Sequence, residues 1–191
     1  MISIFDIFKI GIGPSSSHTM GPMLACNKIV DRINSEQLID RVKTVKVELF
    51  GSLAYTGKAH GTDKALIAGL YGLEAALADP KDIKALYEHV INKKVIELGG
   101  SLSIPFELDT NIIYNIKDNP SYHSNALKVY VYTFDHELLF RETYYSIGGG
   151  AIVSEGQLES HPVEIEYPHE YSSASELFQL CDTKKMNMWD I

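Results

Sequence analysis

The stretch GIGPSSSHTMGP at residues 11–22 places three consecutive hydroxyl side chains and a histidine just before an amphipathic segment. Backbone N–H groups in the first turn of a helix lack partners inside the helix, and the helix dipole adds positive charge there. Such a position favours a carboxylate or a phosphate. We therefore predict that Ser15, Ser16, Ser17 and His18 form an anion site. A purely structural interpretation stays open, because serines are common helix caps and a histidine can be a structural residue.

A second group of chemically capable residues lies in GSLAYTGKAHGTD, at residues 51–63. We expect a strand, a loop and a helix here, and ligands are often held at such junctions. His60 is the best candidate for a general base, because a neutral imidazole accepts a proton near pH 7. Asp63 could instead only cap the next helix, and Lys58 could be a solvated surface charge.

Two further motifs, YHSNA at residues 122–126 and YYSIGGGAI at residues 144–152, carry weaker signals. The first supplies His123 and Asn125. The glycine triplet in the second ends a strand, where it allows a ligand to approach main-chain N–H groups or simply forms a bulge. The remaining histidines are expected at the surface: His89, His136, His161 and His169.

Hydrophobic periodicity predicts the elements that must position these motifs. Helices are expected at residues 20–33, 65–77 and 82–98, and another begins within 172–181. Strands are expected at residues 42–50, 101–107, 111–116, 127–134 and 138–144. A loop that carries Gly57, His60 and Gly61 is expected between the first strand and the second helix.

Helices early in the chain and consecutive strands later predict an α+β fold. We expect a single domain with a mixed, largely antiparallel sheet covered by helices on one face. The chain of 191 residues is long enough to bury a sizeable core without disulfides.

Composition restricts the classes of partner. Hydrophobic residues make up 45% of the chain and charged residues 22%, as in ordinary globular domains. The formal net charge of -8 argues against general affinity for nucleic acid or for an anionic membrane, because both are polyanions. A local basic pocket for a small anion remains compatible with this charge.

The N-terminal sequence and the cysteines indicate a cytoplasmic protein. Asp6 and Lys9 interrupt the apolar N-terminal run, so it does not fit a signal peptide, and no stretch is long enough to span a bilayer. Cys26 and Cys181 lie in apolar, helix-like patterns, which favours reduced, buried thiols over a disulfide. Two cysteines cannot supply the usual four thiolates of an iron–sulfur cluster.

Taken together, the motifs FDIFKIGIGPSSSHTMGP, GSLAYTGKAHGTD, HSNA and TYYSIGGG, in this order and spacing, resemble the N-terminal, or β, portion of the iron–sulfur-dependent L-serine dehydratases. The resemblance covers essentially the whole chain, and the SASELFQLC tail resembles the single-chain form of that family. It implies a β domain at residues 1–160, followed at 161–191 by a linker and the start of a helix that leads to a catalytic α domain absent from this chain.

The resemblance also implies roles for individual residues. His60 is the expected catalytic base. The residues expected to bind L-serine are Ser15, Ser16, Ser17, His18, Thr19, Thr62, His123, Asn125, Ser146 and Gly148. The family uses a [4Fe-4S] cluster whose ligands lie in the α domain, so we expect no metal ligand in this chain, and we expect a homodimer.

Two other functions are compatible with parts of the sequence. The domain type also resembles a substrate-binding allosteric domain of some phosphoglycerate dehydrogenases, so the same loop could hold serine without chemistry, as a regulatory module. A serine hydrolase is disfavoured, because the chain lacks a Gly-x-Ser-x-Gly elbow.

Overall fold

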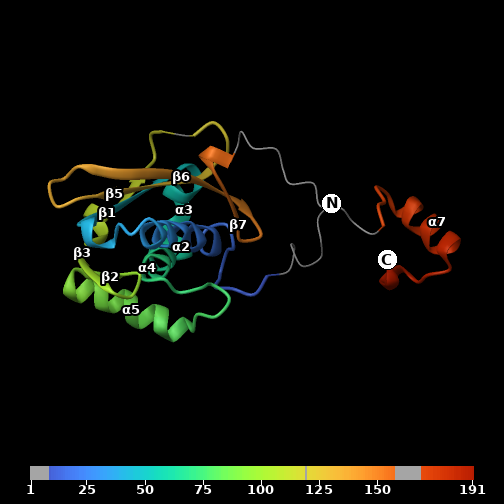
Figure 1. Cartoon of the computed structure of the whole chain (residues 1–191), viewed down its shortest axis with the longest axis horizontal. Coiled ribbons are helices and arrows are strands. Elements are labelled where there is room, and N and C mark those ends of the chain that lie inside the picture. The colour runs from blue at the N-terminus through green and yellow to red at the C-terminus, as the bar shows by residue number, and fades with distance from the viewer. Residues whose placement is uncertain (1–8, 119, 158–168) are drawn as a thin grey trace. The chain divides into compact units, whose positions relative to one another are not determined.

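A five-stranded sheet with the strand order β4-β1-β5-β6-β7 forms the frame of the structure (Figure 1). The computed structural model describes residues 9–118, 120–157 and 169–191. The strands are β1 (Thr44–Phe50), β4 (Ile112–Asn115), β5 (Asn125–Tyr132), β6 (Leu138–Gly148) and β7 (Ala151–Ser154). Only β1 and β4 pair in parallel, while the other three pairs in this sheet are antiparallel. The predicted α+β class and the mixed, largely antiparallel sheet are therefore confirmed.

Alternating side chains give this sheet one buried and one more open face. In β1, Val45, Val47 and Leu49 are fully buried, whereas Lys46 and Glu48 between them remain partly exposed. The same alternation continues through β5. Because successive side chains of a strand point to opposite faces, the apolar set faces the helices and the charged set faces away.

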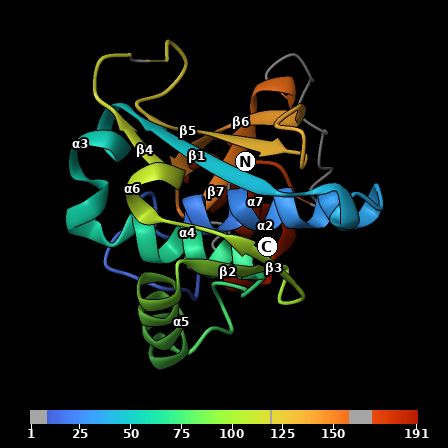
Figure 2. The same ribbon diagram turned by 90° about the vertical axis from the view of Figure 1, so that its left-hand side faces the viewer.

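The α-helices in the described part of the first unit are α2 (Met20–Ser35), α3 (Gly51–His60), α4 (Thr62–Tyr71), α5 (Pro80–Lys93) and the single turn α6 (Leu108–Asn111). Helix α2 runs along one face of the sheet (Figure 2), and α4 packs against α2. The Asn27 side-chain amide of α2 donates to the carbonyl oxygens of Gly69 and Leu73 at 3.1 and 3.0 Å, which holds the last turn of α4 against α2. The start of α2, the helix α3 and the start of α4 position most of the candidate site.

Residues 51–60 form helix α3, so the predicted loop is wrong. Gly51, at a φ of 52°, turns the chain directly from β1 into the helix, and Gly61, at a φ of 74°, separates α3 from α4. Gly57 suggested a loop, but it lies inside the helix, where a Cβ would be 3.0 Å from Thr62 Oγ1. Its missing side chain provides room for packing rather than for a turn.

Residues 95–98 are a strand, so the helix predicted over 82–98 is too long. Helix α5 ends at Lys93, and Lys94 adopts a φ of 56°. Strand β2 (Val95–Leu98) then pairs with β3 (Leu102–Pro105) as an antiparallel hairpin. The apolar residues of β2 fit both the alternation of a strand, with Ile96 and Leu98 buried, and the three- and four-residue spacing of the preceding helix. This overlap explains why the helix was predicted to continue to residue 98. Helix α4 is also shorter than predicted, because Gly72 ends it.

The chain divides into two compact units, Met1–Leu158 and Glu159–Ile191. In the second unit, α7 (Ala174–Lys184) confirms the predicted helix start, and Ser173 caps it by accepting from the Glu176 N–H. Cys181 is half-buried rather than buried as predicted, whereas Cys26 in α2 is fully buried, and both are free thiols.

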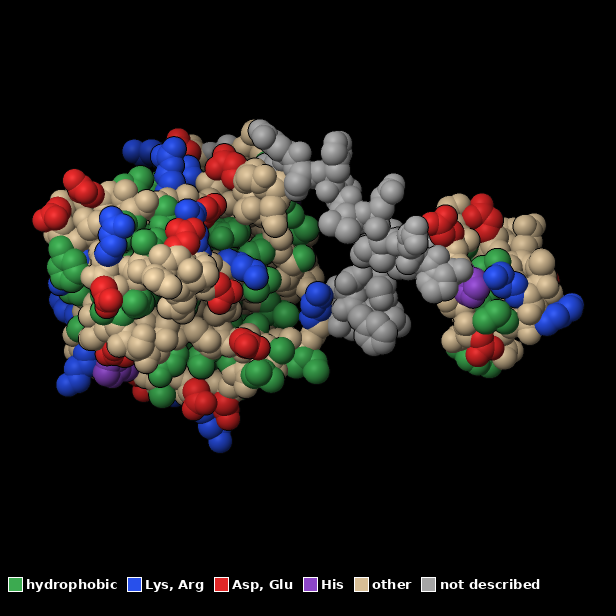
Figure 3. Space-filling model, viewed as in Figure 1, with side chains coloured by type: hydrophobic (Ala, Val, Ile, Leu, Met, Phe, Trp, Pro, Cys, Tyr) green, Lys and Arg blue, Asp and Glu red, His purple; other side chains and the backbone are tan. Residues whose placement is uncertain are grey.

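Acidic and basic side chains are interspersed over the face of the first unit seen in Figure 3. Among the described residues, no helix is long and apolar enough to cross a membrane.

Candidate active site

The serine-rich loop forms a tight turn that leads into α2. The carbonyl oxygen of Ser15 accepts the backbone N–H groups of His18 and Thr19 at 3.1 and 2.9 Å, and the Thr19 hydroxyl at 2.6 Å. Thr19 is the N-cap residue, and no side chain caps the helix. The serines are therefore not N-caps. The Ser15 and Ser17 hydroxyl oxygens are 3.3 Å apart, and the Ser17 hydroxyl also contacts His18.

His18 lies at the centre of a hydrogen-bonded network that joins this loop to α3. Its Nδ1 is 2.9 Å from Ser17 Oγ, and its Nε2 is 3.2 Å from Ser52 Oγ and 3.0 Å from Thr56 Oγ1. The residue is only 8% exposed. Burial, and next the nearby His60, lower the pKa of His18, so its neutral form is favoured.

His60, the last residue of α3, lies beside His18. The two ring centroids are 4.8 Å apart, and the rings are tilted by 41°. His60 Nδ1 is 2.8 Å from the Thr56 carbonyl oxygen. Because a carbonyl oxygen only accepts, Nδ1 carries the proton, and the neutral ring therefore has its lone pair on Nε2. The half-buried His60 thus has an atom available to accept a proton.

The first turn of α4 is bonded to the backbone of His18. Thr62 is fully buried, and its hydroxyl donates to the His18 carbonyl oxygen at 2.6 Å. Asp63 follows in the same turn, where its carboxylate accepts the Lys64 N–H at 2.9 Å and the Tyr87 hydroxyl at 2.7 Å. Gly61 is the N-cap of this helix, so the predicted capping role of Asp63 is wrong, and Asp63 instead anchors α5 through Tyr87.

Asn125 and Ser146 form a second polar group, on the sheet side of α2. The Asn125 side-chain amide donates to the Ser146 carbonyl oxygen at 3.3 Å. Ser146 is fully buried against Gly21, where a Cβ on the glycine would collide with the serine hydroxyl. Ser146 Oγ and Asn125 Oδ1 are buried and have no hydrogen-bond partner among the described residues. Two unsatisfied polar atoms are therefore available beside the first turn of α2.

Main-chain contacts link this second group to the histidines. The Ser52 N–H donates to the Ser124 carbonyl oxygen at 2.8 Å, next to Asn125, while the Ser52 side chain contacts His18. His123 Nδ1 accepts the Asn125 N–H at 3.0 Å. Gly148 pairs with Ala151 in the β6–β7 turn. No contact among the described residues joins His123 or Gly148 directly to the His18–His60 pair.

Ser52 and Thr56 are the residues that the sequence analysis missed. They precede His60 at intervals of four, so a helical interpretation of residues 51–60 would have placed all three on one face. Among the other histidines, His89 and His136 are exposed as predicted, His169 is half-buried, and His161 lies outside the described residues.

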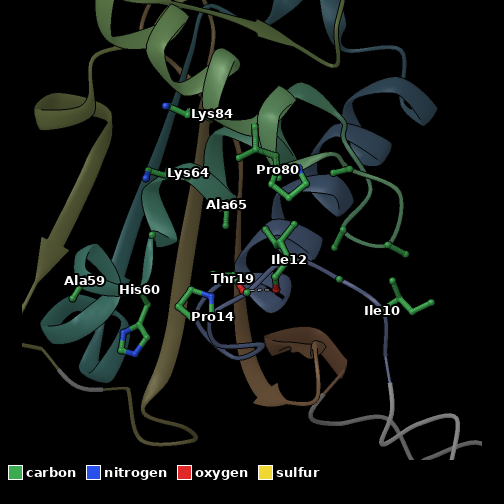
Figure 4. A pocket seen from close by; sticks show the side chains of 17 residues that line it. Ile10, Ile12, Pro14, Thr19, Ala59, His60, Lys64, Ala65, Pro80 and Lys84 are labelled. Carbon is green, nitrogen blue, oxygen red and sulfur yellow. Dashed lines mark hydrogen bonds between the residues drawn. The ribbon is translucent and has the colours of Figure 1, made fainter.

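A cavity of about 620 Å³ opens beside His60. His60 and Pro14 lie at one end of it and Lys84 at the other, with Lys64 along one side (Figure 4). Its lining is otherwise largely apolar, with Ile12 and several alanines. The two lysines give it positive charge, which suits an anionic ligand.

The described residues do not provide a site for a metal centre. No group of three or more His, Cys, Asp or Glu side chains among them is placed to hold an ion. Burial raises the pKa of the Cys26 thiol, which disfavours the thiolate that metal binding requires. A [4Fe-4S] cluster therefore does not fit the residues described in this chain.

Comparison with known proteins places this arrangement in context. Residues 3–157 match the family model of the serine dehydratase beta chain. The chain is 42% identical over 184 residues to L-serine dehydratase TdcG of Escherichia coli, covering 95% of this chain and 40% of that protein. It is 38% identical over 192 residues to an L-serine dehydratase of Helicobacter pylori, covering 99% and 42%, respectively. The chain thus spans about 40% of the length of these relatives.

Proposed function

The chain belongs to the serine dehydratase beta-chain family, and from that premise we propose that it forms the substrate-binding side of an L-serine ammonia-lyase. The paired histidines support this proposal most directly, because one ring is buried within a hydrogen-bonded network while the other has a free acceptor nitrogen. The name of these relatives, L-serine dehydratase, indicates the proposed substrate.

In this proposal the serine-rich loop binds the substrate carboxylate. Neither the Ser16 nor the Ser17 backbone N–H donates a hydrogen bond to another described residue, so both can donate to an anion. The helix dipole of α2 adds positive charge. The buried, unsatisfied atoms of Asn125 and Ser146 offer further polar contacts, while His123 and Gly148 complete the wall.

His60 Nε2 would accept the proton from Cα of serine, the electron pair of the Cα–H bond forms the Cα–Cβ double bond, and the Cβ–oxygen bond breaks with its electron pair on the departing hydroxide. That hydroxide and the proton taken by His60 together make up the one water that is lost. The resulting aminoacrylate tautomerises, and hydrolysis then gives pyruvate and ammonia. The Thr19 hydroxyl donates to the Ser15 carbonyl oxygen, and the Thr62 hydroxyl donates to the His18 carbonyl oxygen. These two residues would therefore hold the first turns of α2 and α4 in place beside the substrate.

The leaving hydroxyl needs assistance that the described residues do not supply. We propose that the iron–sulfur domain implied by the family resemblance would supply it. The cytoplasmic location and the homodimer remain predictions.

The test uses the enzyme assembled from this chain and the remaining portion. We expect His60→Gln to lower the turnover of serine to pyruvate by about 10²- to 10⁴-fold, the usual contribution of a general base. His89→Gln, on the exposed face of α5, is the matched control and leaves turnover unchanged. Near-normal turnover of the His60 variant would exclude it as the base. Retained turnover with altered cooperativity would favour the regulatory function.

A further inference from the structure

Thr56 contacts both histidines of the candidate site. Its carbonyl oxygen is 2.8 Å from His60 Nδ1, and its hydroxyl oxygen is 3.0 Å from His18 Nε2. The intervals of four between Ser52, Thr56 and His60 place these residues on one face of α3. One residue therefore touches both rings, through its backbone and through its side chain.

The donor and the acceptor in each hydrogen bond of His18 follow from the single proton that the Thr56 hydroxyl carries. The Thr56 hydroxyl donates its only proton to the Ser52 carbonyl oxygen at 2.8 Å, so Thr56 Oγ1 can only accept from His18. His18 Nε2 must then carry the proton. In the neutral ring, His18 Nδ1 accepts from the Ser17 hydroxyl at 2.9 Å.

The two imidazoles consequently differ in what they can offer. Both nitrogens of His18 are engaged, so it has no free lone pair for a substrate. His60 uses Nδ1–H to bind the Thr56 carbonyl oxygen and keeps the lone pair of Nε2 free. The two rings are close neighbours, with centroids 4.8 Å apart. Because the tautomer decides which nitrogen carries the lone pair, a change of tautomer in either ring would alter which histidine accepts a proton.

We propose that Thr56 is a positioning residue that sets the tautomers of both histidines, so that His60 serves as the base and His18 as a fixed support for the Ser17 hydroxyl. This inference rests on the proposed function for its catalytic meaning. The hydrogen-bond directions themselves are independent of it.

The test compares three variants of neighbouring residues. Thr56→Val removes the hydroxyl but keeps nearly the same shape and helix propensity, so the helix is retained. Thr56→Ser keeps the hydroxyl. Tyr55→Phe is the matched control, because it removes a hydroxyl of the same helix that donates to the Ile116 carbonyl oxygen rather than to a histidine.

In the assembled enzyme we expect Thr56→Val to raise the KM for serine about three- to tenfold, the effect of losing one hydrogen bond. Its kcat should stay within about twofold, because His60 is held by a backbone carbonyl that the variant keeps. Thr56→Ser should restore the KM, and Tyr55→Phe should leave both constants unchanged.

The second measurement is nitrogen NMR of the 191-residue chain with ¹⁵N-labelled histidine, which reports the tautomer without requiring activity. We expect His18 to carry its proton on Nε2 in the unaltered chain and in Thr56→Ser, and to become a mixture in Thr56→Val. An unchanged His18 tautomer in Thr56→Val would overturn the proposal, as would a fall in kcat alone. If the assembled enzyme does not deaminate serine but the tautomer still shifts, the proposed function fails and the positioning role stands.

Discussion

Gly69 lies where α4 crosses α2, and it provides a sharp test of the packing that positions the site. A Cβ built on Gly69 would be 2.7 Å from the Cys26 Cβ and 3.1 Å from the Met23 carbonyl carbon, and it would also collide with the Met23 carbonyl oxygen. A backbone oxygen cannot rotate away as a flexible side chain can. Gly69→Ala therefore forces the two helices apart.

Two effects of opposite sign decide the outcome. Replacing a helical glycine by alanine stabilises an unconstrained helix by about 1 kcal/mol. Overpacking in a well-packed interior costs about 1–3 kcal/mol, and the rigid backbone contact favours the upper part of this range. We expect a net loss of about 1–2 kcal/mol, which for a chain of this size lowers the Tm by about 2–8 °C.

The assay is thermal and urea unfolding of the 191-residue chain, followed by circular dichroism. Gly156→Ala is the matched control, because a Cβ there meets nothing within 4 Å, and its stability should change by less than about 0.5 kcal/mol. If Gly69→Ala raises the Tm or leaves it unchanged, helix propensity outweighs packing, and the close approach of α2 and α4 is refuted.

Two further predictions concern the histidine network. Thr62→Val removes a buried hydroxyl that donates to the His18 carbonyl oxygen, so we expect the free energy of unfolding measured with urea to fall by about 1–2 kcal/mol. Thr62→Ser keeps the hydroxyl and should retain most of the stability. Equal losses in the two variants would contradict this hydrogen bond. The pKa of His18 is lowered in the folded chain. At pH values just below about 6.5, the ordinary pKa of histidine, this residue therefore binds more protons in the unfolded chain than in the folded chain. The free energy of unfolding should consequently fall as the pH drops from about 7 to about 5. His18→Gln should weaken this dependence, measured as urea midpoints at the two pH values, and an unchanged slope would refute the assignment.

The sequence was most informative where a pattern depends on near neighbours. The amphipathic stripe of α2 and the alternation in β1 predicted both elements, because side-chain periodicity is a local property. It was least informative at residues 51–60, where two glycines and a histidine indicated a loop. Gly57 lies inside the helix and lacks a side chain because Thr62, from the next helix, occupies the space beside it.

The candidate site shows the same division. The serine-rich loop and His60 stand out in the sequence, because their residue types and position before a helix already indicate anion binding and proton transfer. Their partners depend on the folded chain, since Thr56 is 38 residues from His18 and Ser52 is 34 residues away.

Sequence therefore determined which side chains are chemically capable and which family the chain resembles. Only the tertiary structure decided which nitrogen of each histidine carries the proton, because that depends on the acceptors that α3 brings to each ring.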